Sequence, residues 1–328
     1  MMHNPKFTGS QMLKLLFAAA APFLFAGCLA LQGQSFLDNQ RYDEGLTQAK
    51  TALAENPGDP DANYFAGRYL LAQEKPEQAL PYLEKAMRLA PMDPDRHFWL
   101  GVAHWSLFDY EQERAEYLRA LALDSEHISA NLYLGHSYMD SGEYALALAR
   151  YDKVLSVDDL EPGALFNRAA ALDQLGRRAE AHEALLRFLS RYPDGDLGIR
   201  ATNMLNDQGD FTYRNYILGR RTVPLRSIGF EPGSTRFGFD VRASLDVIGA
   251  MLENNPALAL HLVAYCRDHA ELAKARAKRV KQYLLLKHPD LEEQRLLLSW
   301  FGTGETISTA AGEFVLAESF NLITRIPE

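Results

Sequence analysis

The sequence predicts a mainly α-helical protein, in which an α-solenoid precedes a small α+β domain. Two observations carry this prediction. Small residues recur every 34 residues through the middle of the chain, and the recurrence stops after Gly219. Beyond it, apolar runs of strand length alternate with helix-like stretches. Together with an apolar N-terminal segment, they divide the chain into residues 1–27, 28–219 and 220–328.

Composition limits the kind of partner. The 328 residues are 47% hydrophobic and 23% charged, as expected of a folded chain. A net charge of -9 leaves no positive field to attract phosphates, so nucleic acid is excluded as a partner. Two cysteines, Cys28 and Cys266, form neither a disulfide framework nor a zinc site. A disulfide between Cys28 and Cys266 is one alternative in an oxidising compartment. Without that disulfide, Cys266 is expected to be buried and to act as a small apolar residue.

The N-terminal segment has the pattern of a processed signal. Two lysines precede an apolar stretch at 15–25, which is shorter than the ~20 residues of a membrane-spanning helix. The stretch runs into Leu-Phe-Ala-Gly-Cys at 24–28, which resembles the lipobox of bacterial lipoproteins, although Phe25 stands where that family prefers leucine. The resemblance implies that residues 1–27 are a signal peptide and that Cys28 is lipidated. The alternative is an ordinary cleaved signal, or an uncleaved anchor, with Cys28 incidental.

The residue after the cysteine bears on location. Leu29, rather than aspartate, follows Cys28. For a lipoprotein this implies anchoring in the outer membrane, facing the periplasm. Several acyl chains on one cysteine hold a protein to a bilayer, because each buried methylene adds ~0.8 kcal/mol.

The 34-residue period is carried by columns of similar residues. Gly67, Gly101 and Gly135 form the first column, and Ala169 continues it. The other columns hold small, bulky apolar or proline residues: Ala79, Ala147 and Ala181, with Glu113 as the exception; Leu83, Tyr117, Tyr151 and Leu185; Ala86, Ala120, Val154 and Phe188; Pro57, Pro91 and Pro193. These columns resemble the tetratricopeptide repeat, a helix–turn–helix unit whose small residues let its two helices approach closely. The resemblance places repeats at about 26–59, 60–93, 94–127, 128–161 and 162–195, with a capping helix at 196–219.

In such solenoids the first helix of each repeat, helix A, lines the concave face, and the resemblance therefore implies a partner-binding groove. Its expected lining forms three rows: Tyr64, Phe98, Leu132 and Phe166; Arg68, Val102, His136 and Ala170; Leu71, Trp105, Met139 and Asp173. Phenylalanine, tryptophan and methionine at its centre favour an apolar or amphipathic peptide segment. Basic residues are sparse, so a carboxylate clamp is not expected. The alternative is that some of these side chains pack on one another or on the C-terminal domain.

Residues 220–328 are expected to fold as a β-α-β-α-β domain with a closing strand. The expected strands are 223–230, 258–265, 294–301 and 320–326, and the expected helices are 241–252 and 270–286. Several motifs in this order resemble the OmpA-like domain that binds peptidoglycan: FEPGS at 230–234, Asn255-Pro256, LAKARAKRV at 272–280 and FGTGE at 301–305.

The resemblance also implies a ligand site. In that family an aspartate and a helix arginine hold the peptidoglycan stem peptide, because aspartate pairs an ammonium and arginine forks onto a carboxylate. Arg276 matches the arginine, whereas Asp268 lies one place late, after an altered turn at 264–267. The asparagine of the next loop and the paired arginines of the last strand have no counterpart. Asp268 and Arg276 are thus the candidate peptidoglycan site; the alternatives are a surface ion pair and a degenerate module now used for protein contact.

The sequence contains no motif for catalysis. It has no GxSxG, no HExxH and no phosphate-binding glycine loop, so we expect no enzyme activity, no cofactor and no metal. His97 and His104 share a helix face without a third ligand, and His104 is expected to be packed in the core. Glu111, Glu113 and Glu116 are expected to form a solvated face.

These features predict a non-enzymatic outer-membrane lipoprotein that binds protein partners of the cell envelope through its groove. The resemblance to tetratricopeptide lipoproteins implies a role in assembling an envelope machine, such as a pilus or a secretion system. The alternative is a cell-wall tether that binds peptidoglycan, or a regulator of a cell-wall synthase or hydrolase.

Overall fold

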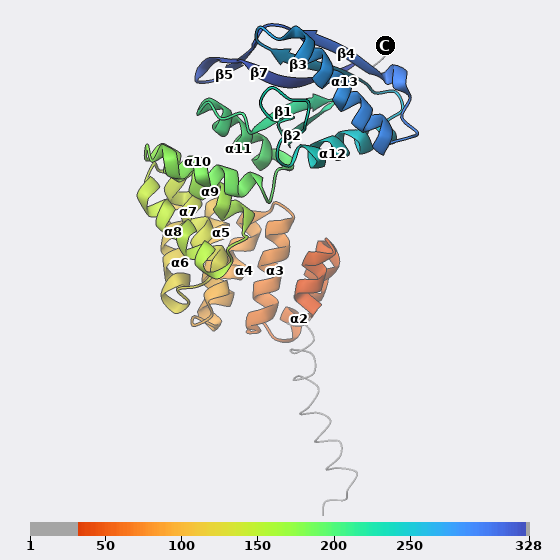
Figure 1. The fold of residues 1–328 in the computed structure, drawn as a ribbon. Coiled ribbons are helices and arrows are strands. Elements are labelled where there is room, and N and C mark those ends of the chain that lie inside the picture. Colours follow the sequence, from red (N-terminus) through yellow and green to blue (C-terminus); the bar gives the residue numbers. More distant parts are fainter. Residues whose placement is uncertain (1–31, 326–328) are drawn as a thin grey trace, which may run out of the picture. The chain divides into compact units, whose positions relative to one another are not determined.

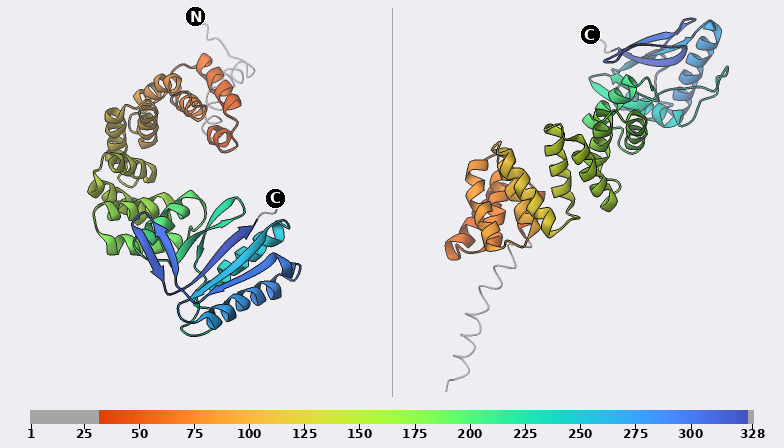
Figure 2. Two further views of the ribbon diagram at one scale, coloured as in Figure 1. Left: turned by 90° about the horizontal axis from the view of Figure 1, so that it is seen from above. Right: turned by 90° about the vertical axis from the view of Figure 1, so that its left-hand side faces the viewer.

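The fold is known from a computed structural model that describes residues 32–325. Cys28 and the predicted signal peptide lie outside the described residues. The first part of the described chain consists of consecutive helices (Figures 1 and 2), with these bounds: α2 Tyr42–Glu55, α3 Pro60–Ala72, α4 Pro76–Leu89, α5 Pro94–Ser106, α6 Tyr110–Leu123, α7 Ile128–Asp140, α8 Tyr144–Val157, α9 Pro162–Gln174, α10 Arg178–Leu189 and α11 Gly195–Asp207. The predicted solenoid is confirmed, with α3, α5, α7 and α9 as the A helices of its repeats. Within residues 32–325, no helix is long and apolar enough to cross a membrane.

The column of small residues exists because the two helices of a repeat touch there. A Cβ atom added to Gly101 would lie 2.5 Å from a ring carbon of Tyr117, which is fully buried. At Gly67 the same atom would lie 2.5 Å from Leu83. These distances are shorter than any normal carbon–carbon contact, so only glycine allows this packing without a shift of the neighbour.

The A helices begin at specific caps. The Asp59 carboxylate accepts hydrogen bonds from the N–H groups of Asp61 and Ala62, and a proline occupies the first turn of α3. The same arrangement of an acidic cap and a following proline starts α5 at Asp93 and α9 at Glu161. In α7 the cap is the imidazole of His127 instead.

A buried polar side chain ties each of three A helices to the loop before it. Asn63 and Asn131 each donate a hydrogen bond to a carbonyl of that loop. His97 holds the equivalent position, with Nε2 3.0 Å from the Pro91 carbonyl oxygen and Nδ1 2.7 Å from a Glu116 carboxylate oxygen. His97 is therefore a structural residue of the repeat, and within the described chain no cluster of metal-ligating groups is present.

His104 is only partly buried. Its Nδ1 lies 3.4 Å from an Asp109 carboxylate oxygen. The prediction that His104 is packed in the core is therefore met only in part.

The prediction of a solvated acidic face on α6 is wrong at two of its three positions. Glu111 is exposed, but Glu113 and Glu116 are only 2% and 3% exposed. They lie on the face of α6 that also carries the buried Tyr117 and therefore packs inside the repeat. The Glu116 carboxylate is hydrogen-bonded to His97 and forms an ion pair with Arg119.

The described chain divides into two compact units, one ending at Asp159 and the other beginning at Leu160. The boundary predicted at 219/220 therefore lies inside the second unit. This follows from the packing of α11, which contacts α10 on one side and the first two strands on the other. Unit 1 contains α2 to α8, and unit 2 contains α9, α10, α11 and the sheet region.

The sheet region of unit 2 holds three small sheets. Its elements are β1 Tyr213–Leu218, β2 Arg221–Arg226, α12 Val241–Asn254, β3 Ala259–Cys266, α13 Ala270–Lys287, β4 Leu296–Phe301, β5 Glu305–Thr309, β6 Gly312–Leu316 and β7 Glu318–Arg325. Strand β3 is central, parallel to β4 and antiparallel to β7, while β1–β2 and β5–β6 are hairpins. The predicted helices match α12 and α13, and three of the predicted strands match β3, β4 and β7. The strand predicted at 223–230 overlaps β2 only over residues 223–226.

Three strands were not predicted as such. Strand β1 occupies part of the expected capping helix, because α11 ends at Asp207 and Gly209 has φ +84. Along β1, Tyr213, Tyr216 and Leu218 are buried while the apolar Ile217 is exposed, so the sequence shows no regular alternation of apolar and polar residues that would predict a strand. The hairpin of β5 and β6 carries little buried apolar surface, so its sequence shows no clear run.

The core of the sheet region lies on one face of β3. Leu260, Leu262, Ala264 and Cys266 alternate along the strand and face α12 and α13, whose apolar sides complete the cluster (Figure 1). Cys266 is a free, buried thiol, as predicted for a small apolar position.

Candidate functional site

The A helices carry the predicted partner-binding residues in three rows. In unit 1 they lie on α3, α5 and α7, one turn of helix apart along each, and neighbouring A helices α3 and α5 contact each other directly. The three rows differ in accessibility, and this difference decides which side chains a partner can reach.

The first row is largely buried, so the prediction that it lines an open groove is wrong at three of its four positions. Phe98 is only 4% exposed, because its ring stacks on Tyr117 at 5.7 Å and meets the edge of Tyr133 at 5.3 Å. Tyr64 lies under the guanidinium groups of Arg68 and Arg96, at 5.3 and 5.2 Å from its ring centroid. Tyr64 and Phe98 therefore follow the alternative interpretation, in which side chains of this row pack against other side chains of the protein.

The other two members of the first row differ. Leu132 on α7 is half-buried. Phe166 on α9, in unit 2, is fully buried against Phe188 of α10, and the guanidinium of Arg200 covers its ring at 4.8 Å. Phe166 is therefore a core residue of the last repeat rather than a contact for a partner.

The second row is half-buried and includes charge. Arg68 stacks over the indole of Trp99 with 4.2 Å between the guanidinium carbon and the ring centroid, and it donates a hydrogen bond to Gln34. The ring of His136 lies 5.7 Å from that of Tyr133. Val102 sits between these two positions on α5 and is half-buried. In unit 1 the row therefore offers one apolar side chain, Val102, between the positive charge of Arg68 and the ring of His136.

The third row contains the most accessible large side chain of the A helices. Trp105 is 49% exposed at the C-terminal end of α5, and no other ring stacks on it in the described chain. Leu71 and Met139 hold the equivalent positions on α3 and α7 and are half-buried. We use the name A-helix surface for the second and third rows in unit 1: Arg68, Leu71, Val102, Trp105, His136 and Met139.

Two aromatic residues beside this surface were missed by the sequence analysis. Trp99 forms the platform for Arg68, and Tyr133 is 38% exposed next to His136. Each follows directly after a first-row residue, Phe98 and Leu132 respectively. The sequence does show an aromatic residue directly after each of these first-row positions, but the three-row pattern did not include it.

The two residues of the candidate peptidoglycan site, Asp268 and Arg276, have different surroundings. Asp268 is an exposed residue of the turn after β3, with φ +62. Arg276 is 3% exposed and pairs instead with Glu318 of β7, at 2.8 Å between Nη1 and Oε2. The alternative of a surface ion pair between Asp268 and Arg276 is therefore wrong, because Arg276 is buried between α13, β3 and β7 and its ionic partner is Glu318.

All three nitrogen atoms of the Arg276 guanidinium donate hydrogen bonds within the protein. Besides the Glu318 carboxylate, it donates to the carbonyl oxygens of Ser234 and Glu231 and to Cys266 Sγ. The ring of Phe230 covers it at 4.9 Å. An incoming carboxylate would have to displace Glu318 to reach this arginine.

Residues 31–94, 66–128 and 132–196 each match the model of the tetratricopeptide repeat. The chain contains tetratricopeptide repeats. Tetratricopeptide-repeat proteins are typically non-catalytic scaffolds for protein interactions. None of the curated proteins matches the sequence.

Solved tetratricopeptide structures share the fold. PilF of Pseudomonas aeruginosa is 18% identical with a TM-score of 0.51, over 58% of this chain and 88% of its own. PilW, a type IV pilus biogenesis factor, is 18% identical with a TM-score of 0.49, over 55% of this chain and 86% of its own. A tetratricopeptide protein of Thermus thermophilus is 24% identical with a TM-score of 0.46, over 55% of this chain and 99% of its own. At these identities the likeness concerns the fold alone.

Proposed function

We propose that this protein is a non-enzymatic scaffold that binds a segment of another protein on its A-helix surface. The observation that carries the proposal is the exposure of Trp105 among half-buried neighbours. An indole of this kind costs solvation free energy in the free protein and supplies a large contact area when a partner covers it. The tetratricopeptide repeats make protein binding the expected use of that surface.

The chemistry of the surface indicates the kind of segment. Val102, Trp105 and Met139 offer an apolar strip, and a methionine thioether adapts its shape to different partners. Arg68 adds a positive charge at one end, held in place by Trp99. An amphipathic segment with apolar side chains and an acidic residue near one end fits these features.

The location belongs to the same proposal. A lipid on Cys28 would hold the scaffold at the outer membrane, with the repeats in the periplasm. Its partner would then be a protein of the cell envelope, and a pilus or secretion system is the kind of machine that the lipoprotein resemblance implies.

Comparative pull-down tests the binding surface. Lipid-anchored wild type is compared with a Trp105→Ala/Met139→Ala variant and with a matched control, Met92→Ala/Phe108→Ala, whose side chains are each 76% exposed in loops between helices. We expect the first variant to lose its main partner and the control to keep it, because only the first removes the apolar strip. Equal partner sets from all three proteins would refute the surface assignment.

Phe98→Ala is unsuitable as a test of binding, because truncating a buried phenylalanine lowers the free energy of unfolding by about 3–5 kcal/mol.

Arg276 favours a second candidate function, a cell-wall tether or a regulator of a cell-wall enzyme, because it holds the arginine position of the OmpA-like resemblance. Binding would require a carboxylate of peptidoglycan to replace Glu318 as the ionic partner of Arg276. Sedimentation of the full chain with purified sacculi tests this: a tether would sediment, and Glu318→Gln would sediment more completely. If both proteins stay in the supernatant, the wall contact is refuted.

A further inference from the structure

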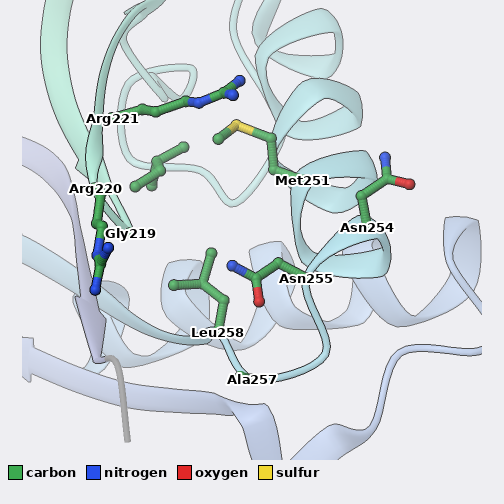
Figure 3. A pocket seen from close by; sticks show the side chains of 9 residues that line it. Gly219, Arg220, Arg221, Met251, Asn254, Asn255, Ala257 and Leu258 are labelled. Atoms are coloured by element: carbon green, nitrogen blue, oxygen red, sulfur yellow. The ribbon is translucent and has the colours of Figure 1, made fainter.

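Unit 2 contains a hollow that neither of these functions uses. It lies between the turn of the β1–β2 hairpin and the C-terminal end of α12, and it has a volume of about 520 Å³ (Figure 3). This volume is in the range of sites for small ligands or for one or two residues of a peptide. The side chains used below are Leu218, Arg220, Arg221, Met251, Asn255 and Leu258.

Both walls of the hollow are held in place by hydrogen bonds. The tight turn of the hairpin needs the positive φ of Gly219, whose N–H donates to Thr324 Oγ1 of β7 at 3.1 Å. On the other wall, Arg295 donates to the carbonyl oxygens of Leu252, Asn255 and Leu258, which fixes the loop after α12. A ligand would therefore meet preformed walls rather than order them on binding.

The rim of the hollow carries uncompensated positive charge. Arg220 and Arg221 are exposed, and within residues 32–325 neither guanidinium has a carboxylate partner. No acidic side chain lines the hollow, although the chain as a whole is negative. Two free guanidinium groups beside one cavity favour an anionic group, onto which arginine can fork with two parallel hydrogen bonds.

The interior is aliphatic. Leu218 and Leu258, which form the floor, are each only 3% exposed. Met251 points into the space from α12 (Figure 3). No aromatic ring lines the hollow, so a nucleobase would find no stacking surface. The Asn255 side-chain amide also faces the space and, in the described chain, has no protein partner. It can therefore bond a peptide group.

We propose that this hollow binds the C-terminal carboxylate of a peptide whose last residue is aliphatic. Arg221, whose side chain reaches across the hollow toward Met251 (Figure 3), takes the carboxylate, and Arg220 adds a second positive charge at the rim. The floor of Leu218, Met251 and Leu258 takes the last side chain, and Asn255 bonds the peptide group before it. The proposal does not depend on binding at the A-helix surface.

The test uses the full chain and a fluorescent tetrapeptide, Gly-Ser-Ala-Leu, in anisotropy titrations. We expect saturable binding of the free acid, and binding weaker by roughly tenfold or more for the C-terminal amide, since the amide removes a charge-assisted pair. Replacing the last leucine by glycine should weaken binding, because the apolar floor is then left uncovered. Inorganic phosphate should compete poorly, because it cannot use that floor.

Substitutions test whether the peptide binds in this hollow. Arg220→Gln/Arg221→Gln should weaken the free acid roughly tenfold or more, whereas Arg242→Gln, which removes an exposed arginine of α12 outside the hollow, should not. Met251→Glu places a carboxylate at the apolar wall and should also abolish binding. Equal binding of acid and amide, equal binding by the double arginine variant, or displacement by phosphate as effective as by peptide would overturn the proposal.

Discussion

Replacing Glu113 should make unit 1 more stable at neutral and alkaline pH. Glu113 stands in a column that is alanine in three other repeats, and its side chain is 2% exposed on α6. One carboxylate oxygen, Oε2, has no hydrogen-bond partner within the described residues. Burial raises the pKa of this carboxyl group from its ordinary 4.5 to about 7, only partly opposed by Arg114.

The sign of the effect follows from the two pKa values. Between pH 4.5 and 7 the folded protein keeps a proton on Glu113 that the unfolded chain has released, so raising the pH through this range lowers the free energy of unfolding. The full shift corresponds to at most about 3 kcal/mol. Glu113→Gln removes this titration, and Glu113→Ala restores the small residue of the column.

Urea unfolding of wild type and Glu113→Gln at pH 5 and pH 8 measures the effect. The variant should gain about 1–3 kcal/mol relative to wild type between the two values. Glu111→Gln is the matched control, because Glu111 is an exposed glutamate of the same helix and should leave the difference unchanged. If wild type and Glu113→Gln keep the same difference in stability at both pH values, the account of a strained buried carboxylate is incorrect.

Three further predictions concern packing and anchoring. Gly101→Ala should lower the free energy of unfolding by roughly 1–2 kcal/mol in urea, although alanine is normally the better helix former, because its methyl group meets Tyr117; an unchanged or raised value would contradict the close approach. Glu318→Leu should destabilise unit 2 by about 2 kcal/mol, because the buried Arg276 loses its counterion, and thermal unfolding equal to wild type would show that the pair is dispensable. Cys28→Ser should move the protein from the membrane fraction to the soluble periplasm on cell fractionation, whereas continued membrane association would exclude the lipid anchor.

The repeat architecture was predictable because it depends on a few strict contacts. Gly67, Gly101 and Gly135 recur because a methyl group at each would collide with the facing helix. The helices and central strands of the sheet region were also predictable, since α12, α13 and β3 have clear apolar patterns.

The binding surface was only partly predictable, because row position alone does not determine burial. Phe98 is covered by Tyr133 and Tyr64 by Arg96, and both covering residues belong to a neighbouring helix. The spacing of residues along the sequence does not predict these contacts. The same holds for Arg276, whose partner Glu318 is 42 residues away on β7. Long-range pairs of this kind depend on which strands become neighbours, and local sequence patterns do not specify that.

Site-specific photo-crosslinking in cells tests the central claim most directly. A photoreactive phenylalanine analogue is placed at Trp105 of the A-helix surface or at Phe108, an aromatic residue of the following turn that is 76% exposed. The scaffold account predicts a discrete protein adduct from position 105, identifiable by mass spectrometry, and none from position 108. Adducts only from position 108, or the same adducts from both positions, would contradict binding on the A-helix surface.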